Sequence, residues 1–288
     1  MMSIRLENGK FGRGMYVSLL WCLIVAIAAM SLYFYTGNRM FSITLLFGFA
    51  LSILDSAMGM GFGTVGVPIL LVFGFQSIVV VPAILAAQFF ASAFGSILHH
   101  KYKNSNLFDF KHEDGKIMLV LVIFGVSGAV IGVILGLILP AIYIKIYIGI
   151  LVSLMGILLL AKSKFNFSWT KLIVFSAVGG FNKALGGGGY GPLSTSSLIA
   201  SGNTIRRSVG ISLFSVAVIN VVAFSLYFLS GKISNYVIIL GLSFGAIIGS
   251  QIGPRITSRM LNEDKSAFGV IIIALGALTV LTAFEILG

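Results

Sequence analysis

Two glycine-rich segments that repeat at a fixed spacing constrain the fold of this chain more than any other feature. One runs from Leu54 to Phe75 and the other from Asn182 to Asn203, and an offset of 128 residues aligns them. Gly59, Gly61 and Gly63 of the first segment then fall on glycines of the second. Glycines at this density break a helix, and the apolar arm after each break is far shorter than the ~20 residues that cross a bilayer. We therefore predict two broken elements that each turn back inside a membrane.

The composition is that of a membrane protein. Hydrophobic residues make up 58% of the 288 residues and charged residues only 9%, whereas soluble domains carry about 25% charged residues. Successive apolar stretches of spanning length indicate a polytopic membrane protein and exclude a soluble domain. A net charge of +11 would suggest nucleic-acid binding in a soluble protein. Here it favours basic loops held in the cytoplasm, and we expect no nucleic-acid partner.

Residues that commonly bind metals are scarce. Cys22 is the only cysteine, which excludes a disulfide within the chain and a thiolate metal site. His99, His100 and His112 lie at or beyond the end of a predicted span, and we interpret the first two as anchors at the membrane interface. We expect no metal and no other cofactor.

Apolar spans and polar loops divide the chain into two similar halves. We predict an all-α polytopic membrane protein of two inverted repeats, residues 40–164 and 165–288, preceded by residues 1–39 with a tail and one extra transmembrane helix. Each repeat contains a glycine-broken re-entrant element and three spanning helices. The predicted apolar segments are Met15 to Tyr35, Met40 to Ser56, Val65 to Phe73, Val79 to Leu98, Lys116 to Leu139, Tyr143 to Ala161, Trp169 to Ala184, Leu193 to Ala200, Ile205 to Leu229, Asn235 to Gly253 and Lys265 to Ile286.

The distribution of basic residues predicts how the halves are oriented. If the N-terminus is cytoplasmic and each broken element enters and leaves on one side, most of the 19 Lys and Arg residues lie in cytoplasmic segments. The first repeat then begins outside and ends inside, whereas the second does the reverse, so the repeats are inverted. Reading each broken element as one continuous crossing would place basic loops on both faces, and we reject it. We expect the protein in the cytoplasmic membrane of the cell.

Glycine recurs at every fourth residue in one later span of each half. The stripes run from Gly128 to Gly136 and from Gly245 to Gly253. Such a stripe gives a helix a flat face on which another backbone can approach closely, which is how helices associate in lipid. We interpret both stripes as packing surfaces rather than as binding sites.

The two breaks predict an anion-binding site. Backbone N–H groups exposed at membrane depth must face protein or a watery cavity, and two such breaks meeting near the midplane form the usual site of a secondary transporter. We expect the return arms to begin at Thr64–Val65 and at Pro192–Leu193, so that both helix N-termini point positive dipole ends at the cavity. Lys183 adds a full positive charge. The predicted substrate-binding residues are Gly59, Gly61, Gly63, Thr64, Lys183, Gly187, Gly188, Gly189, Tyr190, Gly191, Ser194 and Thr195.

Two ionisable residues lie at aligned positions before the breaks, Asp55 in the first segment and Lys183 in the second. Each costs about 2.5–3.5 kcal/mol at the centre of a membrane helix. One interpretation is a structural ion pair across the axis that relates the repeats. The other is a working site, in which Lys183 binds the anion and Asp55 carries a coupling proton or balances charge. Gln88 and Asn220 lie inside later spans and are interpreted as interhelical hydrogen-bonding residues.

The glycine-rich segments resemble those of the sulfite exporter TauE/SafE family, also called the toluenesulfonate uptake permeases. The resemblance is carried by GMGFGTVGVPILL in the first segment and KALGGGGYGPLSTSSL in the second, and it covers roughly residues 40–288. It implies export or uptake of sulfite, sulfonates and related sulfur or carboxylate anions, driven by an ion gradient. Asp55 and Lys183 depart from the family's common pattern, as does Ser196, which aligns with Pro68 of the first copy.

We expect a secondary transporter that moves a small anion by alternating access around the midplane. The alternative is an anion channel in which the same breaks line a pore. An intramembrane enzyme is disfavoured, because no histidine lies at midplane depth to activate a serine and no HEXXH motif is present; we therefore predict no catalytic residues. The expected partners are a small anionic substrate and the lipid bilayer, and self-association into a homo-oligomer is left open.

Overall fold

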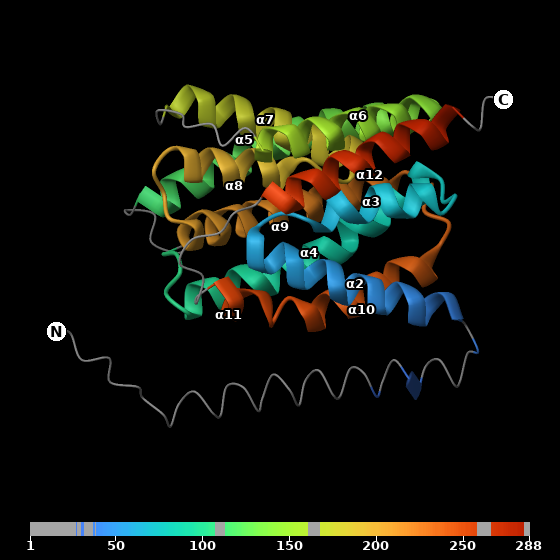
Figure 1. Ribbon diagram of the computed structural model, residues 1–288, viewed down its shortest axis with the longest axis horizontal. Coiled ribbons are helices and arrows are strands. Elements are labelled where there is room, and N and C mark those ends of the chain that lie inside the picture. The colour runs from blue at the N-terminus through green and yellow to red at the C-terminus, as the bar shows by residue number, and fades with distance from the viewer. Residues whose placement is uncertain are drawn as a thin grey trace.

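All regular structure in the described part of the chain is helical, as predicted (Figure 1). The computed structural model describes residues 39–106, 113–160, 168–257 and 266–284, together with residues 27, 30, 31 and 37. The predicted extra span from Met15 to Tyr35 lies outside the described residues, apart from three isolated helical positions. The helices are α2 (Arg39–Met58), α3 (Phe62–Val72), α4 (Ser77–Lys101), α5 (Glu113–Ile138), α6 (Ala141–Leu160), α7 (Trp169–Gly186), α8 (Tyr190–Ala200), α9 (Ile205–Leu229), α10 (Tyr236–Gly249), α11 (Gly253–Thr257) and α12 (Ser266–Phe284).

Six of the described helical segments are long and apolar enough to cross a bilayer, by length and composition. They are α2, α4, α5, the Ala141–Leu158 part of α6, α9, and the Tyr236–Arg255 segment that joins α10 to α11. In contrast, α3 and α8 contain only 11 residues each, which agrees with the prediction that the arm after each break is too short to cross. The chain is therefore a polytopic membrane protein.

The main helix pairings join the two halves of the chain. α2 packs along α10, α5 along α7, α4 along α9 and α6 along α12, and each pair takes one helix from before residue 161 and one from after residue 167. In Figure 1 the blue α2 lies beside the orange α10, and the green α5 lies beside the yellow α7. If each helix is replaced by its counterpart in the other half, the α2–α10 pair becomes the α7–α5 pair. The α4–α9 and α6–α12 pairs then map onto themselves. The halves interlock rather than form separate bodies.

Glycine faces bring two of these pairs into close contact. A methyl group on Gly128 of α5 would collide with the Ala177 carbonyl oxygen of α7. One on Gly245 of α10 would lie 2.6 Å from the Phe49 amide nitrogen of α2. Since neither position has room for a Cβ atom, the backbones of the paired helices touch directly. The packing interpretation of the two glycine stripes is confirmed.

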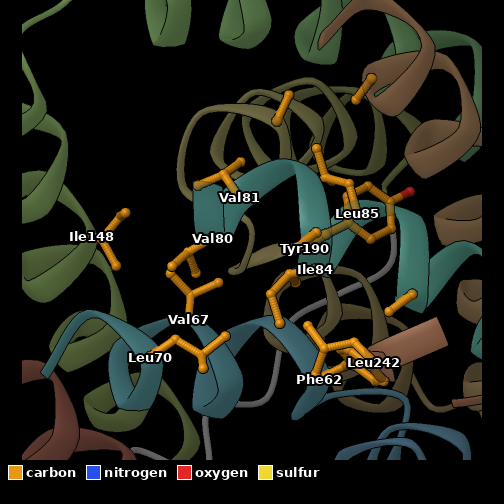
Figure 2. Close-up of a cluster of buried hydrophobic side chains, with 14 of the residues drawn as sticks. Phe62, Val67, Leu70, Val80, Val81, Ile84, Leu85, Ile148, Tyr190 and Leu242 are labelled. Carbon is orange, nitrogen blue, oxygen red and sulfur yellow. The ribbon is translucent and has the colours of Figure 1, made fainter. Parts of the chain in front are cut away.

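The hydrophobic core surrounds the arms that follow the breaks. Phe62 and Val67 of α3, Ile84 of α4, Ile148 of α6 and Tyr190 of α8 are each at most 1% exposed and belong to one cluster. In Figure 2, Val67 and Ile84 lie between α3 and α4, Tyr190 lies beside Leu85 of α4, and Ile148 lies to the left on α6. Because lipid is as apolar as these side chains, van der Waals packing rather than escape from water holds them together. This packing positions the start of each arm.

Candidate functional site

The first broken element is formed by α2 and α3. α2 ends at Met58 and α3 begins at Phe62, rather than at the predicted Thr64–Val65. Gly61 precedes α3 with φ 132° and ψ −42°, a conformation that residues with a Cβ atom rarely adopt. Because this glycine has no side chain that could cap α3, the first turn presents backbone N–H groups toward the break.

The second broken element is formed by α7 and α8. α7 ends at Gly186 and α8 begins at Tyr190, ahead of the predicted Pro192–Leu193. Gly189 precedes α8 with φ 88° and likewise offers no side-chain cap. In both elements a glycine with positive φ redirects the chain and begins the new helix. Pro192 is the third residue of α8, within the first turn, where its missing N–H costs no helical hydrogen bond.

The two breaks touch one another, as predicted. A methyl group on Gly63 would collide with the Gly187 carbonyl oxygen, and one on Gly188 would lie 2.9 Å from the carbonyl carbon of Gly63. Across the same contact, the Thr195 hydroxyl of α8 donates to the Gly59 carbonyl oxygen at 3.2 Å. Glycine is required at these positions because the two backbones approach too closely for side chains between them.

A small buried pocket lies between the breaks. Its cavity volume is about 10 Å³, which is room for about one water molecule. The Thr64 side chain lines the pocket, is 2% exposed and has a hydroxyl with no hydrogen-bond partner. A buried donor left unpaired costs about 1–3 kcal/mol, so this hydroxyl is available to donate to a molecule in the pocket. The lining residues are Asp55, Met60, Gly61, Gly63, Thr64, Gln88, Lys183, Gly188, Gly189, Tyr190, Gly191 and Pro192.

Three polar side chains link the broken elements across this pocket. Nε2 of Gln88, on α4, donates to both carboxylate oxygens of Asp55 at 3.0 Å each. Nζ of Lys183 donates to Oε1 of the same amide and to the Gly187 carbonyl oxygen at 2.6 Å. Asp55 and Lys183 are only 1% and 2% exposed. The acid and the base therefore lie on either side of one amide, and the interhelical hydrogen bonds expected of Gln88 are confirmed.

Asp55 also binds the first turn of α3. The Phe62 backbone N–H donates to Oδ1 of Asp55 at 3.3 Å. A carboxylate at a helix N-terminus is stabilised by the positive end of the helix dipole. Asp55 thus occupies one backbone donor of α3 that a bound anion would also use.

The structure brings most of the predicted site residues to the pocket and leaves four behind it. Ser194 donates within α8 to the Tyr190 carbonyl oxygen at 3.0 Å, and Thr195 is bonded to Gly59. The Tyr190 hydroxyl donates to the Leu121 carbonyl oxygen of α5 at 3.3 Å, so its ring turns toward α5. Predicted residues that do not line the pocket are Gly59, Gly187, Ser194 and Thr195, and lining residues absent from the prediction are Met60, Gln88 and Pro192.

His99 is not an interfacial anchor, contrary to the prediction. It is 0% exposed, and its Nε2 lies 3.0 Å from the Ser56 carbonyl oxygen of α2. Nδ2 of Asn104 lies 3.0 Å from Nδ1; because the amide is the donor, Nε2 carries the proton that is donated to Ser56. His99 therefore fastens the end of α4 to α2 beside Asp55. In the described part of the chain, no three His, Cys, Asp or Glu side chains are grouped as metal ligands.

Comparison with known proteins identifies the family of this chain. Residues 44–281 match the model of the family described as sulfite exporter TauE/SafE. The chain belongs to this family. It is also similar to the probable membrane transporter protein YtnM of Bacillus subtilis (strain 168), with 26% identity over 220 residues that cover 71% of this chain and 70% of YtnM. No solved structure matches the chain.

Membership confirms the resemblance inferred from the two glycine-rich segments. The matched region contains both breaks and every residue that lines the pocket. This TauE/SafE protein is thus a transmembrane transporter, a class that implies transport rather than enzymatic chemistry.

Proposed function

We propose that this TauE/SafE protein is a secondary transporter of a small anion, moved by alternating access and driven by an ion gradient. The expected substrates are sulfite, an organosulfonate or a related sulfur or carboxylate anion, in keeping with the family description. One observation carries the proposal: two half-helix N-termini, the buried Lys183 and the unpartnered Thr64 hydroxyl converge on a single pocket.

The charges around the pocket favour an oxyanion. The N-termini of α3 and α8 each act as roughly half a positive charge, and Lys183 adds a full one, whereas Asp55 contributes the only full negative charge among the lining residues. The glycines of the breaks leave backbone N–H groups open to close approach, as in other anion sites at helix N-termini. The Thr64 hydroxyl supplies a further donor. These groups could replace much of the water around a small oxyanion.

The helix arrangement supports inverted repeats and alternating access. In Figure 1, α2 and α3 meet at the break and open toward the right-hand end, whereas α7 and α8 open toward the left-hand end. The main helix pairs also map onto one another when the halves are exchanged. The pocket has room for about one water and not for a sulfite ion. The state described is therefore closed to an anion of this size, and its entry requires the helices around the pocket to move.

The charges at the helix ends support one orientation of the described helices in the membrane. α4 ends, and α5, α7 and α9 begin, at the left-hand end in Figure 1. Fewer basic residues lie at the opposite end, where α2 begins with Arg39 and Lys232 follows α9. The positive-inside rule then makes the left-hand end cytoplasmic. The basic residues of the left-hand helix ends and the adjoining turn are Lys101, Lys103, Lys116, Lys171, Arg206 and Arg207.

Transport by the purified protein in liposomes tests the proposal. Uptake of sulfite or taurine is measured with and without a pH gradient, and counterflow is measured in liposomes preloaded with unlabelled anion. Saturable uptake with counterflow is expected. Single-channel currents would support a channel instead, and absence of flux across a panel of sulfite, sulfonates and carboxylates would refute anion transport.

Two substitutions assign the roles of the charged residues. Lys183→Ala is expected to abolish anion binding, because it removes the full positive charge from the pocket lining. Asp55→Asn is expected to retain binding but to lose coupled transport. Lys145→Ala is the matched control, since this buried lysine on α6 donates to the Thr282 carbonyl oxygen and does not line the pocket. Unaltered anion affinity in the Lys183 variant would remove that residue from the site.

A further inference from the structure

The Gln88 amide has one orientation that satisfies both of its charged neighbours. A carboxylate accepts hydrogen bonds and cannot donate, whereas an ammonium donates and cannot accept. With Nε2 toward Asp55 and Oε1 toward Lys183, both contacts are favourable. Turning the amide by half a revolution would set N–H groups against the ammonium and an oxygen against the carboxylate. The orientation of Gln88 is therefore tied to the charge on Asp55.

In this closed state the protein's own oxygens occupy the donors that an anion needs. Oε1 of Gln88 accepts from Lys183, and Oδ1 of Asp55 accepts from the first turn of α3. The Thr64 hydroxyl alone of the pocket's buried side-chain donors has no partner, within the described residues. An anion can bind Lys183 and α3 fully only after Gln88 and Asp55 release them.

The buried charges limit what can be bound. Asp55 and Lys183 cancel when both are ionised, and the lining contains no other side chain with a formal charge. A monovalent anion added to this pair would leave one net negative formal charge in a buried site, opposed only by the partial charges of the two helix N-termini, which is unfavourable. One proton taken up by Asp55 restores neutrality. A divalent anion would leave a negative charge even after that proton is bound.

We propose that Gln88 couples the binding of one proton by Asp55 to the binding of one monovalent oxyanion by Lys183, so that the two cross the membrane together without net charge. This inference rests on the proposed transport function. It adds to that function the charge class of the substrate, the stoichiometry and the residue that performs the coupling.

The steps balance with a single O–H bond made and broken. A proton from the side of the membrane to which the site is open adds to the Asp55 carboxylate. The Phe62 backbone N–H of α3 then loses its charged acceptor. The Gln88 amide turns, so that the new carboxyl O–H donates to Oε1 and the Nε2–H groups face Lys183. Lys183, α3 and the turned amide then donate together to the anion. On the other side the anion leaves, Asp55 returns the proton to water, and the amide turns back.

The groups near Asp55 leave Lys183 as its main electrostatic partner. His99 of α4 bonds to the neighbouring Ser56 carbonyl oxygen and offers no proton acceptor to Asp55, because its Nδ1 receives the Asn104 amide. The described part of α3 and of α10 contains no charged or titratable residue apart from Tyr236 at the start of α10. The remaining charged or titratable groups on the helices packed against α2 lie toward helix ends, and they are His100, Lys101, Arg206, Arg207, Tyr227 and Arg255.

Electroneutral symport is tested on the unmodified protein in liposomes. Methanesulfonate is the monovalent probe, since its charge does not change near neutral pH, and sulfate is a divalent probe of similar shape. We expect an inward proton gradient to drive methanesulfonate uptake, and a potassium diffusion potential alone to leave the rate unchanged. Uptake driven by the potential, or sulfate carried in preference to methanesulfonate, would overturn the inference while leaving anion transport in place. No flux of either anion or of sulfite would overturn both.

The role of Gln88 is tested by Gln88→Leu, which removes both amide groups and leaves an apolar side chain one atom shorter. Because the amide also donates to the bound anion, we expect methanesulfonate to bind more weakly, and the stimulation of its uptake by the proton gradient to fall at least tenfold. Gln251→Leu is the matched control, since that amide lies in the turn after α10 and contacts the Ile247 carbonyl oxygen. An unchanged response to the proton gradient in folded Gln88→Leu protein would exclude Gln88 as the coupling residue. If that variant does not fold, the measurement on the unmodified protein still decides the stoichiometry.

Discussion

The chain of contacts from Asp55 through Gln88 to Lys183 predicts how stability responds when its charges are removed singly and together. Lys183→Met would leave the Asp55 carboxylate buried with its amide partner but without a compensating charge. Asp55→Asn would likewise leave the Lys183 ammonium buried without a compensating charge. The double variant removes both charges, and so it avoids the unpaired state that makes each single change costly.

The magnitude follows from the contacts. Two hydrogen bonds of about 3 Å and one amide group separate the carboxylate oxygen from the ammonium nitrogen by at most about 8 Å. At an effective dielectric constant of about 20, two unit charges at that separation attract by about 2 kcal/mol. Loss of this attraction together with the burial of an unpaired charge should destabilise each single variant by about 3–5 kcal/mol. The double variant should therefore be more stable than the sum of the single changes by about 2 kcal/mol or more.

The measurement is the free energy of unfolding in mixed micelles, obtained by titration with dodecyl sulfate and followed by tryptophan fluorescence. Lys145→Met is the control for loss of a buried lysine outside the pocket. Additive effects of the Asp55 and Lys183 variants, within about 0.5 kcal/mol, would mean that the two charges do not interact through Gln88. That result would refute the electrostatic argument for the site.

Two further substitutions test the geometry of the pocket. Gly63→Ala would drive a methyl group into a carbonyl oxygen of the opposite break, so we expect a loss of about 1–3 kcal/mol in unfolding free energy and loss of transport. Gly95→Ala, where the nearest atoms lie at 3.3 and 3.4 Å, should be much milder, and equal effects would contradict the close contact. Thr64→Val removes the unpartnered hydroxyl, so stability should hold while anion affinity falls about tenfold. Unchanged affinity in binding measurements would place Thr64 outside the site.

The breaks and their convergence could be predicted from the sequence because closely spaced glycines interrupt a helix wherever they occur. A fixed offset then identifies the second copy, and the short arm after each break indicates a return rather than a crossing. The structure confirms that the breaks touch. The starting residues of α3 and α8 were predicted too late, because the predicted starts rested on residues within the arms. The helices in fact begin just after Gly61 and Gly189, at the turn in the backbone.

Other parts of the site depend on tertiary placement that a uniformly apolar helix does not encode. That Gln88 reaches both Asp55 and Lys183 depends on the depth and rotation of α4, and a helix apolar on all sides gives no preferred face. His99 lies near a helix end, which predicted an exposed position, but the turn after α4 folds back and places Asn104 over it. The span predicted from Asn235 to Gly253 is likewise interrupted by the turn between α10 and α11.

The exchanged pairing of α2 with α10 and of α5 with α7 determines what can fold and move as a unit. The flat glycine face of α10 is covered by the first helix of the other half, and that of α5 by α7. Produced alone, either half would expose its glycine face, because the helix that covers this face belongs to the other half. Neither half should therefore transport when it is produced alone, whereas producing both halves together should restore transport. Any rigid body that moves within the bilayer must combine segments from both halves of the chain.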